Sequence, residues 1–297
     1  MISAIQLPEM DPVLLRLGPL ALRWYGLAYV AGFLVGYTGL VRMLRHGRLR
    51  LTERQLSDLL GWVVAGVLVG GRLGWWVLYH RADGAAEPWY EPLAVWRGGM
   101  SFHGGLAGVV TVLLVWCRRN AVSFLNVADC AAFVAPIGLF LGRVANFINA
   151  ELVGRPTAVP WGVVYAHEAV ARHPSQLYEA ALEGPVLLLA LWVSRRRLHS
   201  ADGQAAAAFV LLYALFRFAA EFTRHPDEQL GYIAFGWLTM GQLASAATAV
   251  AALALWLTDL WQRRQTPALS DRSKKKPDWP RSLRRRPGDA VELQRSR

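Results

Sequence analysis

The segment 142–156, with the sequence GRVANFINAELVGRP, concentrates side chains that could do chemistry. It follows an apolar run and contains five polar or charged residues, namely Arg143, Asn146, Asn149, Glu151 and Arg155. At the centre of a lipid-facing helix each charged side chain costs roughly 3 kcal/mol or more, so a polar group must meet these residues at the membrane surface. A guanidinium fork matches phosphate or carboxylate geometry. If the segment is helical, Arg143 and Asn146 share one face and can reach one anionic ligand together.

A histidine opens another apolar stretch in SFHGGLAG, residues 101–108. His103 is the natural candidate for a proton acceptor near neutral pH. The glycines, Gly104 among them, permit close approach of backbone or lipid. The equally favoured alternative is a His103 that donates to a backbone carbonyl in a glycine-packed helix interface.

Three more segments place polar side chains beside apolar runs. RHPSQLYE, residues 172–179, is typical of a helix start with Ser175 as N-cap. Tyr213 and Arg217 are four residues apart on one helical face, and Glu221 continues the stripe. RHPD, residues 224–227, ends that helix at the predicted outer surface of the membrane. RWYG, residues 23–26, begins the first apolar run at the same predicted depth.

The composition places these segments in a membrane. Of the 297 residues, 54% are hydrophobic and 18% are charged. A bilayer-spanning helix needs about twenty apolar residues. Seven runs approach that length, roughly 18–41, 58–79, 99–117, 124–145, 178–194, 204–222 and 236–258.

The distribution of basic residues predicts the orientation. Of the 32 Lys and Arg, 22 lie on alternate connections or in the C-terminal tail, as expected for cytoplasmic loops. We therefore predict an all-α polytopic membrane protein with seven transmembrane helices. Its N-terminus lies outside, its C-terminus lies inside, and a small extracytoplasmic cap spans about residues 146–176.

Three arginines fall within or at the ends of predicted spans: Arg72, Arg143 and Arg217. A cation there needs a partner or a wet cavity, and intramembrane charges are functional by default. The structural alternative is ion pairing, with Glu151 and Glu221 as counter-ions.

Two domains are predicted. Residues 1–262 form the membrane domain, and residues 263–297, rich in Ser, Pro, Lys and Arg, form a disordered basic cytoplasmic tail suited to anionic lipid. We expect no nucleic-acid partner, because the tail is tethered at a membrane. Cys117 and Cys130 are predicted to lie far apart in depth, so neither a disulfide nor a metal site is expected.

The segments RWYGL, SFHGGLAG, GRVANFINAELVGRPT, RHPSQLYEA and YALFRF…EFTRHPD occur in one order on this frame. Together they resemble the bacterial prolipoprotein diacylglyceryl transferase family over about residues 10–260. The family's central block often carries Gly where this chain has Ala145 and Ala150. The resemblance implies an enzyme of the bacterial cytoplasmic (inner) membrane whose active site faces the extracytoplasmic side. It transfers a diacylglyceryl group from phosphatidylglycerol to the lipobox cysteine of a prolipoprotein and releases glycerol phosphate, with no cofactor or metal.

The resemblance also implies residue roles. Arg143 and Arg217 are expected to bind the lipid phosphate and to stabilise the charge that develops as it leaves. His103 is expected to be the base that activates the thiol, unless the arginines lower the thiol pKa themselves and His103 positions the lipid. Tyr25 and Tyr213 join this catalytic set. Further residues are expected to orient head group and peptide or to hold the arginines, namely Gly104, Asn146, Glu151, Gly154, Gln176, Glu221 and Arg224.

Two alternatives remain from the residues alone. In a transporter or flippase for anionic lipid, the arginines select the lipid without a covalent product. Another phospholipid head-group enzyme, such as a phosphatidyl transferase, usually needs acidic metal-binding motifs, and none stands out in the sequence.

Overall fold

The computed structural model describes residues 5–8, 11, 13–17, 20–78, 99–166, 168–198, 201–226 and 231–265, and within them the chain is mostly helical. Two compact units divide the chain, Met1–Leu253 and Ala254–Arg297. The described part of the second unit is the end of the last helix. The predicted domain boundary at residue 262 stays a prediction, and the predicted basic tail lies outside the described residues from position 266 onward.

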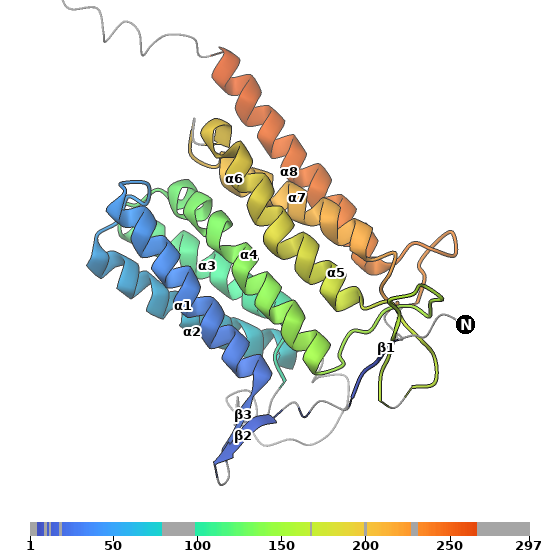
Figure 1. Cartoon of the computed structure of the whole chain (residues 1–297). Coiled ribbons are helices and arrows are strands. Elements are labelled where there is room, and N and C mark those ends of the chain that lie inside the picture. Colours follow the sequence, from blue (N-terminus) through green and yellow to red (C-terminus); the bar gives the residue numbers. More distant parts are fainter. Residues whose placement is uncertain are drawn as a thin grey trace, which may run out of the picture. The chain divides into compact units, whose positions relative to one another are not determined.

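The helices follow the apolar runs of the sequence (Figure 1). They are α1 (Trp24–Arg45), α2 (Glu53–Leu78), α3 (Phe102–Arg119), α4 (Phe124–Ile148), α5 (Ser175–Ala181), the π-helical η4 (Leu182–Val186), α6 (Leu187–Leu198), α7 (Gln204–Ala220) and α8 (Met240–Gln265). The segments α5, η4 and α6 form one continuous helical stretch.

Five helices of the described chain are long and apolar enough to cross a membrane: Trp24–Arg45, Glu53–Val77, Phe124–Ile148, Ser175–Leu198 and Met240–Thr258. This finding confirms a mostly helical protein with several membrane-spanning candidates. The two remaining predicted spans coincide with α3 and with the shorter apolar helix α7. The count of seven and the orientation of the termini stay predictions.

The first predicted span, 18–41, was wrong at its start. Residues Leu20–Arg23 form strand β3, which pairs antiparallel with β2, Val13–Leu17. The helix α1 begins only at Trp24. The apolar residues before it are continuous with the helical run in composition, but they satisfy their backbone groups in a hairpin instead.

Helix α4 is the element on which the others assemble. It contacts α1 on one side and α5, η4, α6 and α7 on the other. Its start is capped by Ser123, whose Oγ accepts from the N–H of Asn126 at 3.2 Å. Near its end α4 carries Arg143 and Asn146, and Glu151 and Arg155 of the sequence block 142–156 follow the helix.

Helices α2 and α3 approach each other along glycines. A Cβ at Gly70 would lie 2.9 Å from Cα of Gly108, and a Cβ at Gly74 would lie 2.6 Å from Cα of Gly104. Both contacts are closer than real Cβ atoms come. Small residues at this spacing allow helix backbones to pack closely in a membrane.

The connection between α4 and α5 has little regular structure. It contains β4, Val163–Val164, which pairs in parallel with β1, Ile5–Gln6. A backbone bridge joins Pro156 to Arg172, and another joins Gly154 to Arg224. The connection is therefore tied both to the N-terminal strand and to the end of α7.

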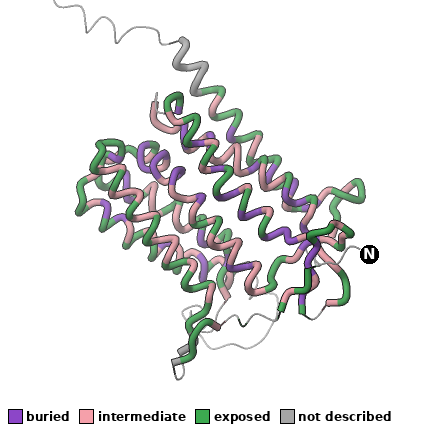
Figure 2. The backbone as a smooth tube through the Cα atoms, viewed as in Figure 1, coloured by how far each residue is buried: buried purple, intermediate pink, exposed green. Residues whose placement is uncertain are grey.

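Helix α1 presents apolar side chains outward. All 22 of its residues are described and none is buried (Figure 2), and exposed apolar side chains on it include Val30 and Leu34. Such a surface is costly in water and suited to lipid.

The glycine contacts predict how α2 responds to one added methyl group. Gly70→Ala forces α2 and α3 apart and should lower stability by about 1–3 kcal/mol. Gly61→Ala makes the same change on the same helix, at a position where a Cβ meets nothing within 4 Å. It should be neutral or stabilising, because Ala favours helix over Gly. Thermal unfolding of both full-length variants in detergent measures the difference; equal melting temperatures would contradict this account.

Candidate functional site

The C-terminal part of α4 directs two side chains, Arg143 and Asn146, at carboxylates. Arg143 Nη1 lies 2.7 Å from Glu179 Oε2, and its Nε donates to Glu183 Oε2 at 3.1 Å. Asn146 Nδ2 donates to Glu151 Oε2 at 3.0 Å. Residues three apart share a helix face, which explains why both reach inward from α4.

Helix α7 brings a second arginine to the same place. Arg217 Nη2 lies 2.7 Å from Glu221 Oε2, the pair expected from their spacing, and its Nη1 lies 3.5 Å from Glu179 Oε1. Arg224, just after the helix, places Nη1 3.7 Å from that oxygen. Since Arg143 contacts the other Glu179 oxygen, this one carboxylate links α4, α5 and the end of α7.

The segment α5–η4 supplies two of the carboxylates. Glu179 and Glu183 are fully buried and four residues apart. Pro185 has no N–H, so the carbonyl four residues earlier cannot receive its α-helical hydrogen bond, and the π-helical turn lies at this point. Gly184 lets this turn press against α4, because a Cβ there would lie 2.7 Å from Cβ of Phe140.

Two groups of side chains make up the site. We call Arg143, Arg217 and Arg224 the arginine cluster, and Glu179, Glu183 and Glu221 the buried carboxylates. The arginine side chains keep 11% to 17% of their surface exposed, whereas the carboxylate side chains keep 6% or less. A ligand that enters the site therefore meets guanidinium groups first.

Not all of these ion pairs are aligned hydrogen bonds. Within the described residues, both oxygens of Glu179, Nη1 of Arg217 and Oε2 of Glu221 are buried without an aligned partner. Most buried polar atoms have one, and its lack costs about 1–3 kcal/mol. Glu179, Glu221 and Nη1 of Arg217 thus retain unused hydrogen-bonding capacity beside partly exposed guanidinium groups.

The start of α8 fixes Glu221. Thr239 Oγ1 donates to Glu221 Oε1 at 3.0 Å, and a Cβ at Gly241 would lie 2.6 Å from that oxygen. Thr239 also caps α8: Gln242 N–H donates to its Oγ1, and its own N–H donates to Gln242 Oε1. The carboxylate that holds Arg217 is therefore itself held by a helix N-terminus.

A second layer of hydrogen bonds supports Glu151. Its Oε1 accepts from Asn149 Nδ2 at 3.3 Å, and its backbone oxygen accepts from Gln176 Nε2 at 2.6 Å. Gln176 Oε1 accepts from the hydroxyl of Tyr165 at 3.1 Å, and burial raises the pKa of that phenol, which keeps it protonated as a donor. These hydrogen bonds of Gln176 go to the connection after α4 rather than to the arginine cluster.

Gly154 and Arg155 join the connection to the end of α7. Arg155 Nε donates to the backbone oxygen of Arg224 at 2.8 Å, and its Nη2 donates to that of Glu221 at 3.4 Å. A Cβ at Gly154 would lie 2.8 Å from the backbone oxygen of Thr223. Only a glycine allows this close approach, so Gly154 secures the register of the two segments.

The predicted N-cap of α5 was wrong. The helix begins at Ser175 itself, with Pro174 in the cap position. The Ser175 hydroxyl instead donates to the backbone oxygen of Leu152 at 3.1 Å. The positive φ angles of Ala150 and Leu152 turn the chain sharply here, which presents that carbonyl to α5.

The two expected tyrosines lie at the edges of the cluster. Tyr213, one turn before Arg217 on α7, is close enough to Arg143 for the two to interact electrostatically. Tyr25, in the first turn of α1, interacts in the same way with Glu151 and Arg143. Both phenols therefore lie within electrostatic range of Arg143, and among the described residues neither forms a hydrogen bond with the arginine cluster.

His103 and Gly104 lie at the start of α3, which packs on α2. The close approach of Gly104 to Gly74 confirms a glycine-packed helix interface. His103 is exposed, and its contact within the described residues is an edge-on ring contact with Phe102, with centroids 5.7 Å apart. The structure thus brings neither residue into direct contact with the arginine cluster.

Arg72 contacts the segment that precedes α3 and a tryptophan of its own helix. Its Nη1 donates to the backbone oxygen of Gly99 at 3.3 Å, and its guanidinium lies 4.5 Å from the ring centroid of Trp75. Of the two proposed counter-ions, Glu221 pairs with Arg217, whereas Glu151 accepts from asparagines.

The sequence analysis did not predict that Glu179 and Glu183 pair with the arginines of the site. Glu179 falls in the sequence that predicts a helix start, and Glu183 lies inside the predicted span 178–194. A signal was present, because acidic residues four apart in a predicted span need partners as much as arginines do.

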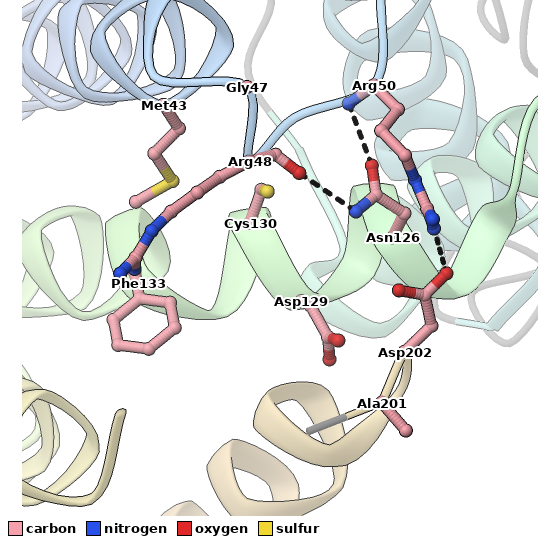
Figure 3. A pocket seen from close by; sticks show the side chains of 10 residues that line it. All are labelled: Met43, Gly47, Arg48, Arg50, Asn126, Asp129, Cys130, Phe133, Ala201 and Asp202. Carbon is pink, nitrogen blue, oxygen red and sulfur yellow. Dashed lines mark hydrogen bonds and ion pairs between the residues drawn. The ribbon is translucent and has the colours of Figure 1, made fainter. Parts of the chain in front are cut away.

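A cavity of about 260 Å³ lies at the other end of α4, away from the arginine cluster, and its lining includes Asn126 and Asp129 (Figure 3). Asn126 accepts from the N–H of Arg50 and donates to the backbone oxygen of Arg48. Asp129 accepts from the N–H groups of Gly203 and Ala206 at the start of α7. These polar groups are occupied in joining three chain segments, so we regard this cavity as a structural junction.

The described residues contain no group of three His, Cys, Asp or Glu side chains that could hold a metal ion. Cys117 and Cys130 are both free and buried.

Comparison with known proteins identifies the family. A sequence model described as prolipoprotein diacylglyceryl transferase matches residues 12–258. Proteins named phosphatidylglycerol–prolipoprotein diacylglyceryl transferase are similar over most of the chain. The one from Nitratidesulfovibrio vulgaris (strain DP4) is 48% identical over 254 residues, covering 84% of this chain and 94% of the relative.

Two further proteins with that name are similar to this chain over most of its length. The protein from Rhizobium meliloti (strain 1021) is 46% identical over 258 residues, covering 84% of this chain and 92% of its own length. The one from Legionella pneumophila (strain Lens) is 43% identical over 258 residues, covering 86% and 98%. With its arginine-lined site in a helical frame of membrane-spanning character, this chain belongs to the prolipoprotein diacylglyceryl transferase family.

Proposed function

We propose that this chain transfers the diacylglyceryl group of phosphatidylglycerol to the lipobox cysteine thiol of a prolipoprotein, forming a thioether and releasing glycerol phosphate. The observation that carries the proposal is the arginine cluster, whose partly exposed guanidinium groups are held by buried carboxylates. Family membership supplies the reaction, and the cluster supplies a place for the lipid phosphate.

The reaction breaks the bond between a glyceryl carbon and a phosphate oxygen. The thiol sulfur attacks that carbon, and the electron pair of the broken bond stays on the phosphate. The thiol proton passes to a base or to solvent. Arg143 and Arg217 bind the phosphate and stabilise the negative charge that develops on it, where preorganised cations are most effective. Arg224 extends the same cationic surface toward the connection after α4.

The thiolate is the nucleophile, and a free thiol has a pKa of about 8.5. Most of the thiol is therefore protonated at neutral pH and must lose its proton before it attacks. The arginine cluster can lower that pKa through its positive field. The alternative is His103 as general base, which requires substrate to bridge the start of α3 and the arginine cluster. A pH profile separates the two.

The remaining residues orient the substrates in this proposal. Tyr25, Tyr213 and Asn146 border the arginines and are placed to bind head group or peptide. Glu221 holds Arg217. Gln176, Glu151 and Gly154 shape the connection above the site, and Gly104 sets the distance between α2 and α3.

We place the enzyme in the bacterial cytoplasmic (inner) membrane with seven spans, its N-terminus outside and its C-terminus inside. The 22 basic residues on alternate connections support this orientation, and the site then faces the extracytoplasmic side. In this scheme residues 1–262 are the catalytic membrane domain, with its cap at about 146–176. The basic tail 263–297 lies along anionic lipid on the cytoplasmic face.

The direct test uses purified protein in detergent with phosphatidylglycerol and a synthetic lipobox peptide. Mass spectrometry should find a diacylglyceryl adduct on the peptide cysteine, released glycerol phosphate, and no adduct on a Cys→Ser peptide. Folded protein that binds the lipid without forming an adduct would instead favour the transporter or flippase.

Neutralising either phosphate-binding arginine should abolish most activity. Arg143→Gln and Arg217→Gln are each expected to lower the transfer rate by about 100-fold or more. Arg143→Lys keeps the charge but loses the fork and should recover part of the rate. Arg50→Gln, which removes a surface ion pair with Asp202, is the matched control and should leave the rate unchanged. Near wild-type transfer by either glutamine variant, in protein that accumulates normally in the membrane, would refute the phosphate-binding role.

The role of His103 is read from a pH profile. His103→Gln should slow transfer, and base catalysis of this kind contributes about 100-fold or more. If His103 is the base, the loss shrinks as the pH rises toward the thiol pKa, because more thiolate forms without help. Initial rates between neutral and alkaline pH measure this; a loss that is constant across pH assigns His103 to positioning.

A further inference from the structure

Glu179 differs from the other two buried carboxylates in the number of arginines with which it forms ion pairs. Three guanidinium groups approach it: Arg143 at 2.7 Å, Arg217 at 3.5 Å and Arg224 at 3.7 Å. Glu183 contacts Arg143, and Glu221 contacts Arg217. Glu179 is thus the shared counter-ion of the whole arginine cluster.

The quality of the contacts differs as well. Glu183 accepts hydrogen bonds from Nε and Nη2 of Arg143, and Glu221 accepts one from Thr239. Within the described residues neither oxygen of Glu179 has an aligned hydrogen bond, although both are buried. Ion pairs that lack this alignment are easier to exchange for another anion.

A carboxylate and a phosphodiester offer the same feature to a guanidinium fork, namely two oxygens that share one negative charge. The three buried carboxylates already balance the charge of the three arginines. A phosphate that binds to Arg143 and Arg217 therefore competes with an anion that is already present, and Glu179 is the anion common to both.

We infer that Glu179 is an internal counter-anion, which occupies the shared face of the arginine cluster between turnovers and is displaced by the phosphate of the lipid. This inference rests on the proposed function. Glu183 and Glu221 keep their aligned contacts and hold the arginines in place during the exchange. Glu179 lies on the seven-residue helix α5, just before the π-helical turn, where the regular hydrogen-bond ladder is already interrupted.

The exchange has two opposite consequences. Competition from Glu179 weakens the binding of both lipid and released glycerol phosphate. The same competition speeds product release, because the carboxylate recaptures the arginines as the phosphate departs. A purely structural Glu179 has the reverse signature, since its loss would leave the arginines less ordered and phosphate binding weaker.

Glycerol phosphate binding to the full-length enzyme in detergent, measured by calorimetry, tests the inference. Glu179→Gln should bind about tenfold more tightly than wild type, because the competing anion is gone; tenfold lies within the usual range of coupling between binding groups. Its KM for phosphatidylglycerol should fall, and kcat should fall with it as product release slows. Glu183→Gln makes the same change four residues away but removes an aligned support of Arg143, so it should bind no more tightly than wild type.

The opposite result is equally specific. Glu179→Gln that binds glycerol phosphate as weakly as wild type, or more weakly, overturns the inference. If that variant does not fold, Glu179→Asp retracts the carboxylate and should still bind more tightly than wild type; unchanged or weaker binding again overturns it. A wild-type enzyme that forms the thioether while Glu179→Gln binds no more tightly refutes only this inference. A wild type that neither binds glycerol phosphate nor forms the adduct refutes the proposed function as well.

Discussion

The cost of burying charge controls the architecture of this protein. Glu179 and Glu183 are buried inside a helical segment that packs on α4, and arginines from α4 and from the end of α7 compensate their charges. Removing one partner of such a group typically costs about 3–5 kcal/mol, since the other charge is left uncompensated. The ion pairs therefore hold three helices in one arrangement, and the same arrangement presents guanidinium groups to a ligand.

Neighbouring glycines and a capped helix start position the segments that carry these ion pairs. Gly184 allows the α5–η4 segment to come close to α4, and the capped start of α8 holds Glu221. Gly154 lets the connection after α4 pack on the end of α7, where Arg155 binds backbone oxygens. Several residues of the sequence block 142–156 thus pack around the ends of the helices that carry the arginines.

The sequence predicted the arginines and the helical frame well, for physical reasons. An arginine in an apolar run is expensive in lipid, so Arg143 and Arg217 stood out, and the i,i+4 pair with Glu221 followed from helix geometry. The hairpin before α1 was missed because its apolar residues continue the composition of the helix. The partners of Gln176 and Ser175 could not be predicted, since they depend on how the turn after α4 folds over α5. The role of Glu179 was not predicted because its arginine partners come from α4 and from the end of α7, which meet only in the fold.

The central claim is that the buried carboxylates orient Arg143 and Arg217 to bind a lipid phosphate. The most direct measurement is a high-resolution structure of the full chain in a lipid nanodisc with phosphatidylglycerol and no peptide acceptor. Our account predicts phosphate oxygens within hydrogen-bond distance, about 2.9 Å, of guanidinium nitrogens of both arginines. A well-defined lipid whose phosphate lies where neither arginine reaches it would contradict the account.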